Sequence, residues 1–136
     1  MILMLVSFLV ALATLIVIHE FGHYQVAKWC GVKVLRFSIG FGKPLWQSQR
    51  GADATEWVIA AIPLGGYVKM LDEREAPVAA HELDRAFNRQ QVWKRMLIVL
   101  AGPVANLLLA VILFWGLLIT GVEDLRAVLG DIAPRT

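Results

Sequence analysis

The residues best suited to chemistry lie together near the start of the chain, in the stretch His19-Glu20-Phe21-Gly22-His23. On a helix, residues four apart share one face about one turn apart, so both imidazoles can reach a single metal ion. A catalytic zinc ion binds imidazole nitrogen and keeps one position open for water. Glu20 projects about 100° around the helix from His19, which suits a general base acting on that water. We therefore predict that His19 and His23 bind Zn²⁺ and that Glu20 is the catalytic base.

The motif supplies only two of the three protein ligands that a catalytic zinc site requires. An extended motif with a third histidine would need Gly at position 26 and His at position 29, but Val26 and Trp29 stand there. The remaining candidate ligands lie in a polar segment, where we expect them to be solvated: Asp72, Glu73, Glu75 and His81. We therefore expect the third ligand to come from outside this chain.

The elements that must position the motif are two long apolar segments, residues 1–18 and 96–120, with Asn106 the one strongly polar residue of the second. The whole chain is 58% hydrophobic with a mean hydropathy of +0.64, above the roughly 45–50% apolar content of soluble domains. Eighteen helical residues rise about 27 Å, close to the thickness of the bilayer core. We predict an α-helical membrane protein with transmembrane helices at 1–30 and 96–120. A cleaved signal peptide is disfavoured because no basic residue precedes the first segment.

The basic residues set the expected orientation of the two helices. Of the 13 Lys and Arg residues, 11 lie between the apolar segments. The positive-inside rule then places residues 28–95 on the cytoplasmic side and both termini outside the cytoplasm. A net charge of +2 gives no case for nucleic acid as a partner, whereas the lipid bilayer is an expected one.

The region between the helices is expected to be a small antiparallel β-hairpin. Apolar and polar residues alternate over 35–41 and again from 54, which is the period of a strand. We predict two to four strands within residues 31–71, with a hairpin connection over 47–55. Residues 72–82 are expected to form a polar cytoplasmic linker, and residues 83–95 an amphipathic helix that leads into the second span.

Several motifs, in this order, resemble the bacterial site-2 proteases. These are HEFGH in the first span, RFSIGFGKPLW and IPLGGYVKMLDE in the middle, and AGPVAN in the second span. The resemblance covers about residues 5–130. It implies an intramembrane zinc metalloprotease of the bacterial inner membrane, with both termini in the periplasm. The implied substrate is an anti-sigma-factor-like single-pass membrane protein that is cut within its transmembrane segment. The resemblance also implies that His19 and His23 are zinc ligands and that Glu20 is the catalytic base.

The same resemblance implies a membrane-reentrant β-hairpin that holds an unwound substrate strand by strand addition. Gly40, Gly42, Gly65 and Gly66 would let a substrate backbone approach closely, although ordinary turn glycines explain them equally well. Asn106 would either contact the neighbouring helix or help to hold a substrate carbonyl near the zinc ion.

Members of this family continue into periplasmic PDZ domains and a later span whose aspartate is the third zinc ligand. Residues 121–136 resemble the start of such a PDZ domain. We therefore expect an N-terminal segment that is inactive alone. The alternatives from other classes are a non-catalytic metal-binding or transport membrane protein and a membrane anchor with an incidental HExxH motif.

Overall fold

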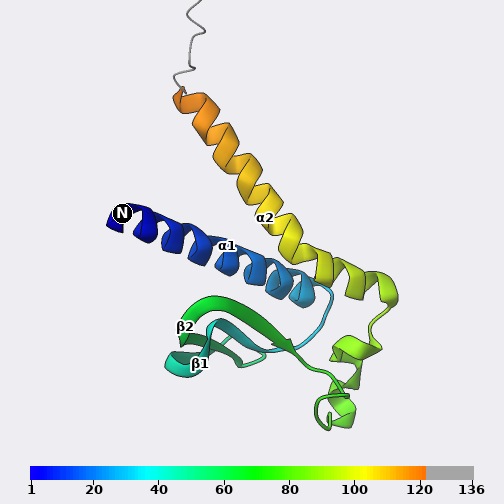
Figure 1. The fold of residues 1–136 in the computed structure, drawn as a ribbon. Coiled ribbons are helices and arrows are strands. Elements are labelled where there is room, and N and C mark those ends of the chain that lie inside the picture. Colours follow the sequence, from blue (N-terminus) through cyan, green and yellow to red (C-terminus); the bar gives the residue numbers. More distant parts are fainter. Residues whose placement is uncertain (122–136) are drawn as a thin grey trace, which may run out of the picture.

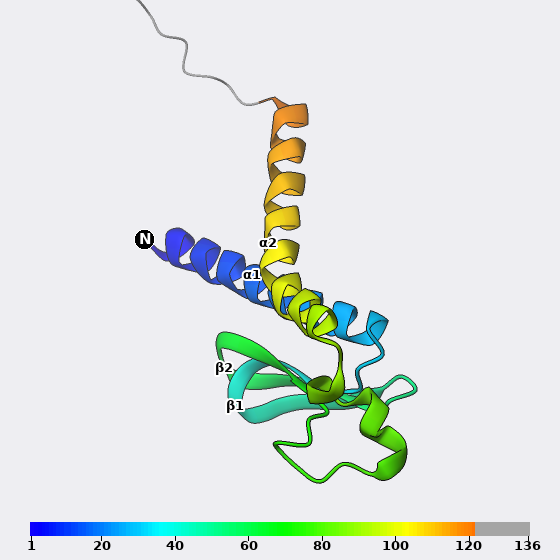
Figure 2. The ribbon, with the colours of Figure 1, turned by 90° about the vertical axis from the view of Figure 1, so that its right-hand side faces the viewer.

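The computed structural model describes residues 1–121, which form two long helices and one bent two-stranded sheet. The elements are α1 (Ile2–Trp29), β1 (Val34–Arg50), β2 (Thr55–Met70), the 3-10 helices η1 (Ala80–Arg85) and η2 (Phe87–Arg89), and α2 (Val92–Thr120). Figures 1 and 2 place the sheet on one side of α1 and the C-terminal part of α2 on the other. Two apolar helices flanking an antiparallel hairpin are thus confirmed. The predicted PDZ start lies outside the described residues.

Both helices are long and apolar enough to cross a membrane. None of the residues in the most apolar stretch of α1 is buried, and only 11% of those in α2 are. A core helix of a soluble domain would instead be mostly buried. Helices that are apolar on every side and exposed within residues 1–121 need lipid or further helices around them.

α2 bends in its first third, which is yellow to green in Figure 1. Pro103 lies inside the helix. A proline removes one backbone N–H and pushes away the carbonyl four residues earlier, here that of Val99, and sharp bends in helices are commonly found at proline. The bend turns the N-terminal part of α2 toward the end of α1, where the two helices meet (Figure 2).

The two strands are long because each bends and contributes two stretches to the sheet. Residues 34–39 pair antiparallel with 66–70, and residues 44–50 pair antiparallel with 55–60. The bend also brings residues 36–39 beside 56–59, where partner numbers rise together, so this central contact has a parallel register. The connection is confined to residues 51–54, shorter than the predicted 47–55.

The bend of β1 depends on two glycines. Gly40 and Gly42 have φ angles of +89° and +83°, in the left-handed region that other residues adopt only with strain. A Cβ on Gly40 would lie 2.9 Å from the carbonyl oxygen of Ile62. These glycines therefore allow β1 to turn tightly across β2.

Aromatic side chains attach the near end of the sheet to α1. The ring of Tyr24 lies 5.8 Å from that of Phe37 and 5.1 Å from that of Trp57. At the far end of the sheet, the large apolar side chains are exposed instead: Leu45, Trp46, Ile62 and Leu64. The aromatic residues of the hairpin therefore divide between packing on the helix and an outward-facing apolar tip.

Residues 83–91 differ from the prediction. The helix expected over 83–95 is replaced by η1 and η2, and α2 begins only at Val92. Ala86, between the two 3-10 helices, has an extended backbone with φ −74° and ψ 137°, which no α-helix accommodates. Side-chain hydrogen bonds stabilise this irregular backbone. These local polar contacts outweigh the weakly amphipathic sequence pattern that predicted a helix.

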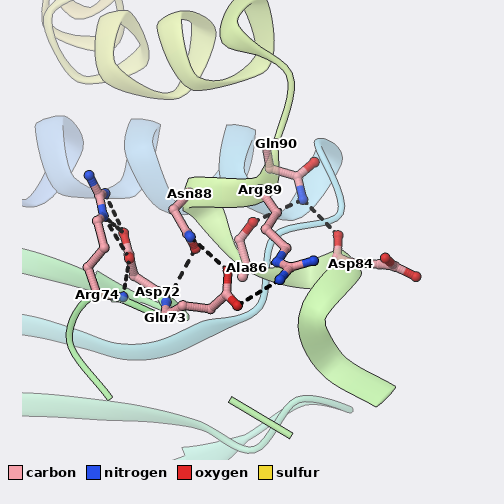
Figure 3. Close-up of polar contacts among 8 residues, drawn as sticks. All are labelled: Asp72, Glu73, Arg74, Asp84, Ala86, Asn88, Arg89 and Gln90. Carbon is pink, nitrogen blue, oxygen red and sulfur yellow. Dashed lines mark hydrogen bonds and ion pairs between the residues drawn. The ribbon is translucent and has the colours of Figure 1, made fainter. Parts of the chain in front are cut away.

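These contacts form what we call the linker network, shown in part in Figure 3. Glu73 accepts hydrogen bonds from Asn88 at 2.8 Å and from Arg89 at 2.7 Å. Asp72 accepts from the side chain of Arg74 at 2.9 Å. Two further contacts complete the network, a bidentate pair between Arg85 and Asp53 in the hairpin turn and an ion pair between Lys33 and Glu82.

Candidate active site

The helical half of the site is a short stretch of α1. His19 and His23 lie on one face, with ring centroids 4.8 Å apart and ring planes at 81°. Glu20 lies beside them, and all three side chains are half-buried. The segment has no Gly or Pro before Gly22, so the helix continues regularly through the first imidazole and the carboxylate.

The other half of the site is a stripe on α2 formed by Ile98, Gly102 and Asn106. These residues are four apart, so they share one face of the helix. The carbonyl oxygen of Ile98 lies 2.7 Å from Nδ1 of His23, and the amide of Asn106 lies 3.4 Å from Nδ1 of His19. Each imidazole of α1 is thus matched by one polar group of α2, with Gly102 between them.

Gly102 leaves open the space toward which both imidazoles point. A Cβ at this position would lie 2.7 Å from Nε2 of His19 and still closer to Nε2 of His23. The two Nε2 atoms therefore converge on one volume that any larger residue would fill. This arrangement fits a metal ion bound by two imidazole nitrogens.

The surroundings of His23 also suit metal binding through Nε2. A carbonyl oxygen can only accept, so Nδ1 of His23 carries the hydrogen and donates it to Ile98. The lone pair of the neutral ring is then on Nε2, the nitrogen that faces Gly102. Among residues 1–121, no group of three or more His, Cys, Asp or Glu side chains could hold a metal ion. This part of the chain therefore offers two imidazole ligands.

Small residues bring the two helices close enough for these contacts. A Cβ on Gly22 would lie 2.5 Å from the carbonyl oxygen of Ala101 and 2.8 Å from the Cβ of Ala105. Sequence reasoning missed Gly22 and Gly102 as parts of the site. The available signal was the small residues at 101, 102 and 105, because close helix crossings in membranes favour such residues.

Glu20 lies between two hollows that separate α1 from the sheet. The larger, of about 440 Å³, is lined by Glu20, His23 and the β2 residues 66–70, together with residues of the linker and α2. The smaller, of about 270 Å³, also contains Glu20 and is lined by apolar and small residues with His19 and Asn106: Leu15, Ile16, Phe41, Gly65 and Gly66. Glu20 can therefore be reached from both sides.

The β2 segment 66–70 borders the larger hollow with a free edge. It pairs with residues 34–39 of β1 on one side, and no other strand of residues 1–121 pairs with it. Gly66 packs against Glu20, since a Cβ at position 66 would lie 3.0 Å from Cγ of Glu20. Backbone hydrogen-bonding groups are thus offered beside Glu20.

The structure brings together most of the residues predicted for the site. His19, Glu20, His23 and Asn106 meet where the helices cross, and Gly65 and Gly66 lie next to them. Gly40 and Gly42 line neither hollow, and their positive φ angles are explained by the bend of β1. Phe41, whose ring lies against Gly65, was not predicted, because only the bend returns it to the site.

Comparison with known proteins identifies relatives over most of the chain. A family model for peptidase family M50 matches residues 7–133. The chain is 61% identical over 122 residues to a protein of Xylella fastidiosa that carries the words "zinc metalloprotease" in its name. It is 55% identical over 132 residues to the regulator of sigma-E protease RseP of Escherichia coli and 54% identical over 132 residues to protease RseP of Yersinia pestis.

These matches cover 90% to 97% of this chain but only 27% to 29% of each relative. The chain therefore spans less than a third of the length of the curated relatives that it matches.

Proposed function

The chain belongs to peptidase family M50, and we propose that it forms the N-terminal part of the active site of a zinc-dependent intramembrane protease. The convergence of Nε2 of His19 and Nε2 of His23 on the space beside Gly102 carries this proposal. Ionisable side chains within a membrane span are costly and mark functional sites. A bound cation and a hydrolytic reaction explain why these residues stand together in α1.

In this proposal His19 and His23 hold zinc, and the third ligand comes from outside residues 1–121. Bound zinc would lower the pKa of a water molecule to about 7 and polarise the scissile carbonyl. Glu20 accepts the proton of the attacking water and delivers it to the leaving amine nitrogen as the peptide bond breaks. The two hollows that Glu20 borders leave open space beside this residue.

The substrate we propose is a transmembrane segment of another membrane protein, unwound into an extended strand. The free edge of residues 66–70 offers backbone groups for strand addition. Gly65 and Gly66 have no side chains, which leaves room for the substrate backbone beside β2. Gly40 and Gly42 contribute through the bend that returns Phe41 to the site, and Asn106 borders the smaller hollow. The name of the Escherichia coli relative refers to regulation of sigma-E, so we propose an anti-sigma-factor-like single-pass protein as the substrate class.

We propose the following membrane arrangement. The first span is residues 1–30, the reentrant hairpin residues 31–71, the cytoplasmic linker residues 72–95 and the second span residues 96–120, in a bacterial inner membrane. Both termini are then periplasmic. The exposed apolar tip of the hairpin, which includes Leu45, Trp46 and Leu64, enters the lipid interface, where aromatic residues are favoured.

The test is cleavage of a membrane-embedded substrate by the full-length gene product carrying Glu20→Gln. Removing a general base lowers the rate by about 10²- to 10⁴-fold, and we expect zinc content to be retained. The matched control is Asp84→Asn, the same change from carboxylate to amide at an exposed residue that lines neither hollow, and it should leave cleavage unchanged. Wild-type cleavage by the Glu20 variant would exclude the assigned role. Bound zinc without cleavage by any form would point to a non-catalytic metal-binding or transport protein.

A further inference from the structure

We infer that Asn106 is a positioning residue for His19, whose amide oxygen accepts a hydrogen bond from Nδ1–H and so directs the lone pair of Nε2 toward Gly102. This inference rests on the proposed zinc site, and it assigns Asn106 a task distinct from holding substrate. Asn106 is the one strongly polar side chain between residues 96 and 119 of α2.

The contact itself is the first observation. The Asn106 amide lies 3.4 Å from Nδ1 of His19, with Nδ2 as the near atom. The amide oxygen Oδ1 is buried and has no hydrogen-bond partner among the described residues. An asparagine in this position therefore has an acceptor that it does not use, directly beside a ring nitrogen that can donate.

The chemistry of the imidazole decides which end of the amide faces His19 in the metal-binding state. If Nδ2 donates to Nδ1, the ring hydrogen is on Nε2, and Nε2 then has no lone pair for a cation. A half-turn of the amide about its last side-chain torsion exchanges Oδ1 and Nδ2, which have nearly the same size. Oδ1 then accepts from Nδ1–H, and the lone pair of Nε2 points toward Gly102.

His23 shows the same arrangement already complete. Its Nδ1–H donates to the carbonyl oxygen of Ile98 at 2.7 Å. Ile98 and Asn106 lie four residues before and after Gly102, on one face of α2. The helix therefore supplies one acceptor for each imidazole, a backbone carbonyl for His23 and a side-chain amide for His19, with the open space between them.

The test measures zinc affinity by chelator competition in the purified full-length gene product. Asn106→Leu removes the acceptor at similar volume, and we expect zinc affinity to fall by about 10- to 100-fold, as is typical when a partner of a metal-bound histidine is lost. Asn106→Asp keeps an acceptor oxygen and should restore most of the affinity. Asn88→Leu, the same change in the linker network, should leave zinc affinity unchanged.

A second measurement separates positioning from packing. The melting temperature of the metal-free protein should be no lower for the Leu variant than for the Asp variant, because an ionisable side chain within a span is costly. The rise in melting temperature on adding zinc should nevertheless be smaller for the Leu variant. Unchanged zinc affinity in Asn106→Leu, or equal losses in both variants, would overturn the inference. Failure of the proposed function looks different, because wild-type protein would then bind no zinc, or His19→Ala would bind it as well as wild type.

Discussion

Two regions of the molecule hold their polar side chains in opposite ways. Where α1 crosses α2, His19 and His23 each meet one group of α2 and direct their other nitrogen into a space left by Gly102. In the linker network, by contrast, Glu73 accepts from both Asn88 and Arg89. The side chains at the helix crossing keep a nitrogen lone pair available for a ligand, whereas the carboxylate of the linker network is already hydrogen-bonded to other residues of the chain.

This difference separates function from stability. A lone pair that faces an open space does little for folding, but it is what a cation requires. A carboxylate that accepts several hydrogen bonds stabilises the folded chain and has little left for a ligand. Changes at the crossing should therefore abolish metal binding with modest effects on folding, and changes in the linker network should do the reverse.

The largest effect is expected for Gly102→Ala. The added methyl group would occupy the space between the two Nε2 atoms, so zinc affinity should fall below detection in the full-length gene product. Gly116→Ala is a matched control in the same helix, because a Cβ there meets nothing within 4 Å. The control should bind zinc normally. Equal zinc binding by both variants would show that the ion does not lie between the imidazoles.

The sequence could predict one side of the crossing but not the other. His19, Glu20 and His23 can be recognised in the sequence because the spacing of a single helix places them close together. Their roles stay predictions. The role of Gly102 cannot be predicted in this way. The turn of α2 that faces His19 depends on the angle and position at which the two helices cross. Asn106 could be singled out as a polar residue in an apolar span, but its partner could not.

The sheet and the linker show the same limit. Alternating residues indicated strands over 35–41 and from 54 onward. The first stretch lies within β1, and β2 begins one residue after the start of the second. The bend at Gly40 and Gly42, which extends the pairing to Arg50, follows from contacts between distant residues. The helix predicted over 83–95 was wrong because hydrogen bonds to Glu73 and the extended Ala86 outweigh a weak helical pattern.

An intermediate effect, on stability alone, is expected for Asp53→Asn. Arg85 donates to this carboxylate at 2.7 and 2.9 Å and, as the main cause, holds the pKa of Asp53 below its ordinary value of 3.8. Loss of the charge should cost about 1–2 kcal/mol of folding free energy, with zinc affinity unchanged. Thermal unfolding tests the expected loss of stability, and chelator competition on the same preparation tests whether zinc affinity is unchanged. A variant that loses zinc affinity would mean that the two regions are coupled.

The smallest effect compares two neighbouring carboxylates, through Glu73→Gln and Glu75→Gln. Hydrogen bonds from Arg89, and then from Asn88, hold the pKa of Glu73 below its ordinary value of 4.5. A lowered pKa means that the stabilisation by Glu73 is complete above pH 4.5 and is lost as the pH falls through the lower folded-state value. Among residues 1–121, the one ion pair of Glu75 is with Lys69, at 4.0 Å and with both side chains more than half exposed, and such surface pairs contribute little. At neutral pH, thermal unfolding should therefore show a slightly lower melting temperature for the Glu73 variant than for the Glu75 variant.

This difference in melting temperature should shrink in acid, because the Glu73 carboxylate that the Glu75 variant retains is then itself protonated. A difference that stays the same in acid would mean that Glu73 stabilises the linker network through packing rather than through its charge.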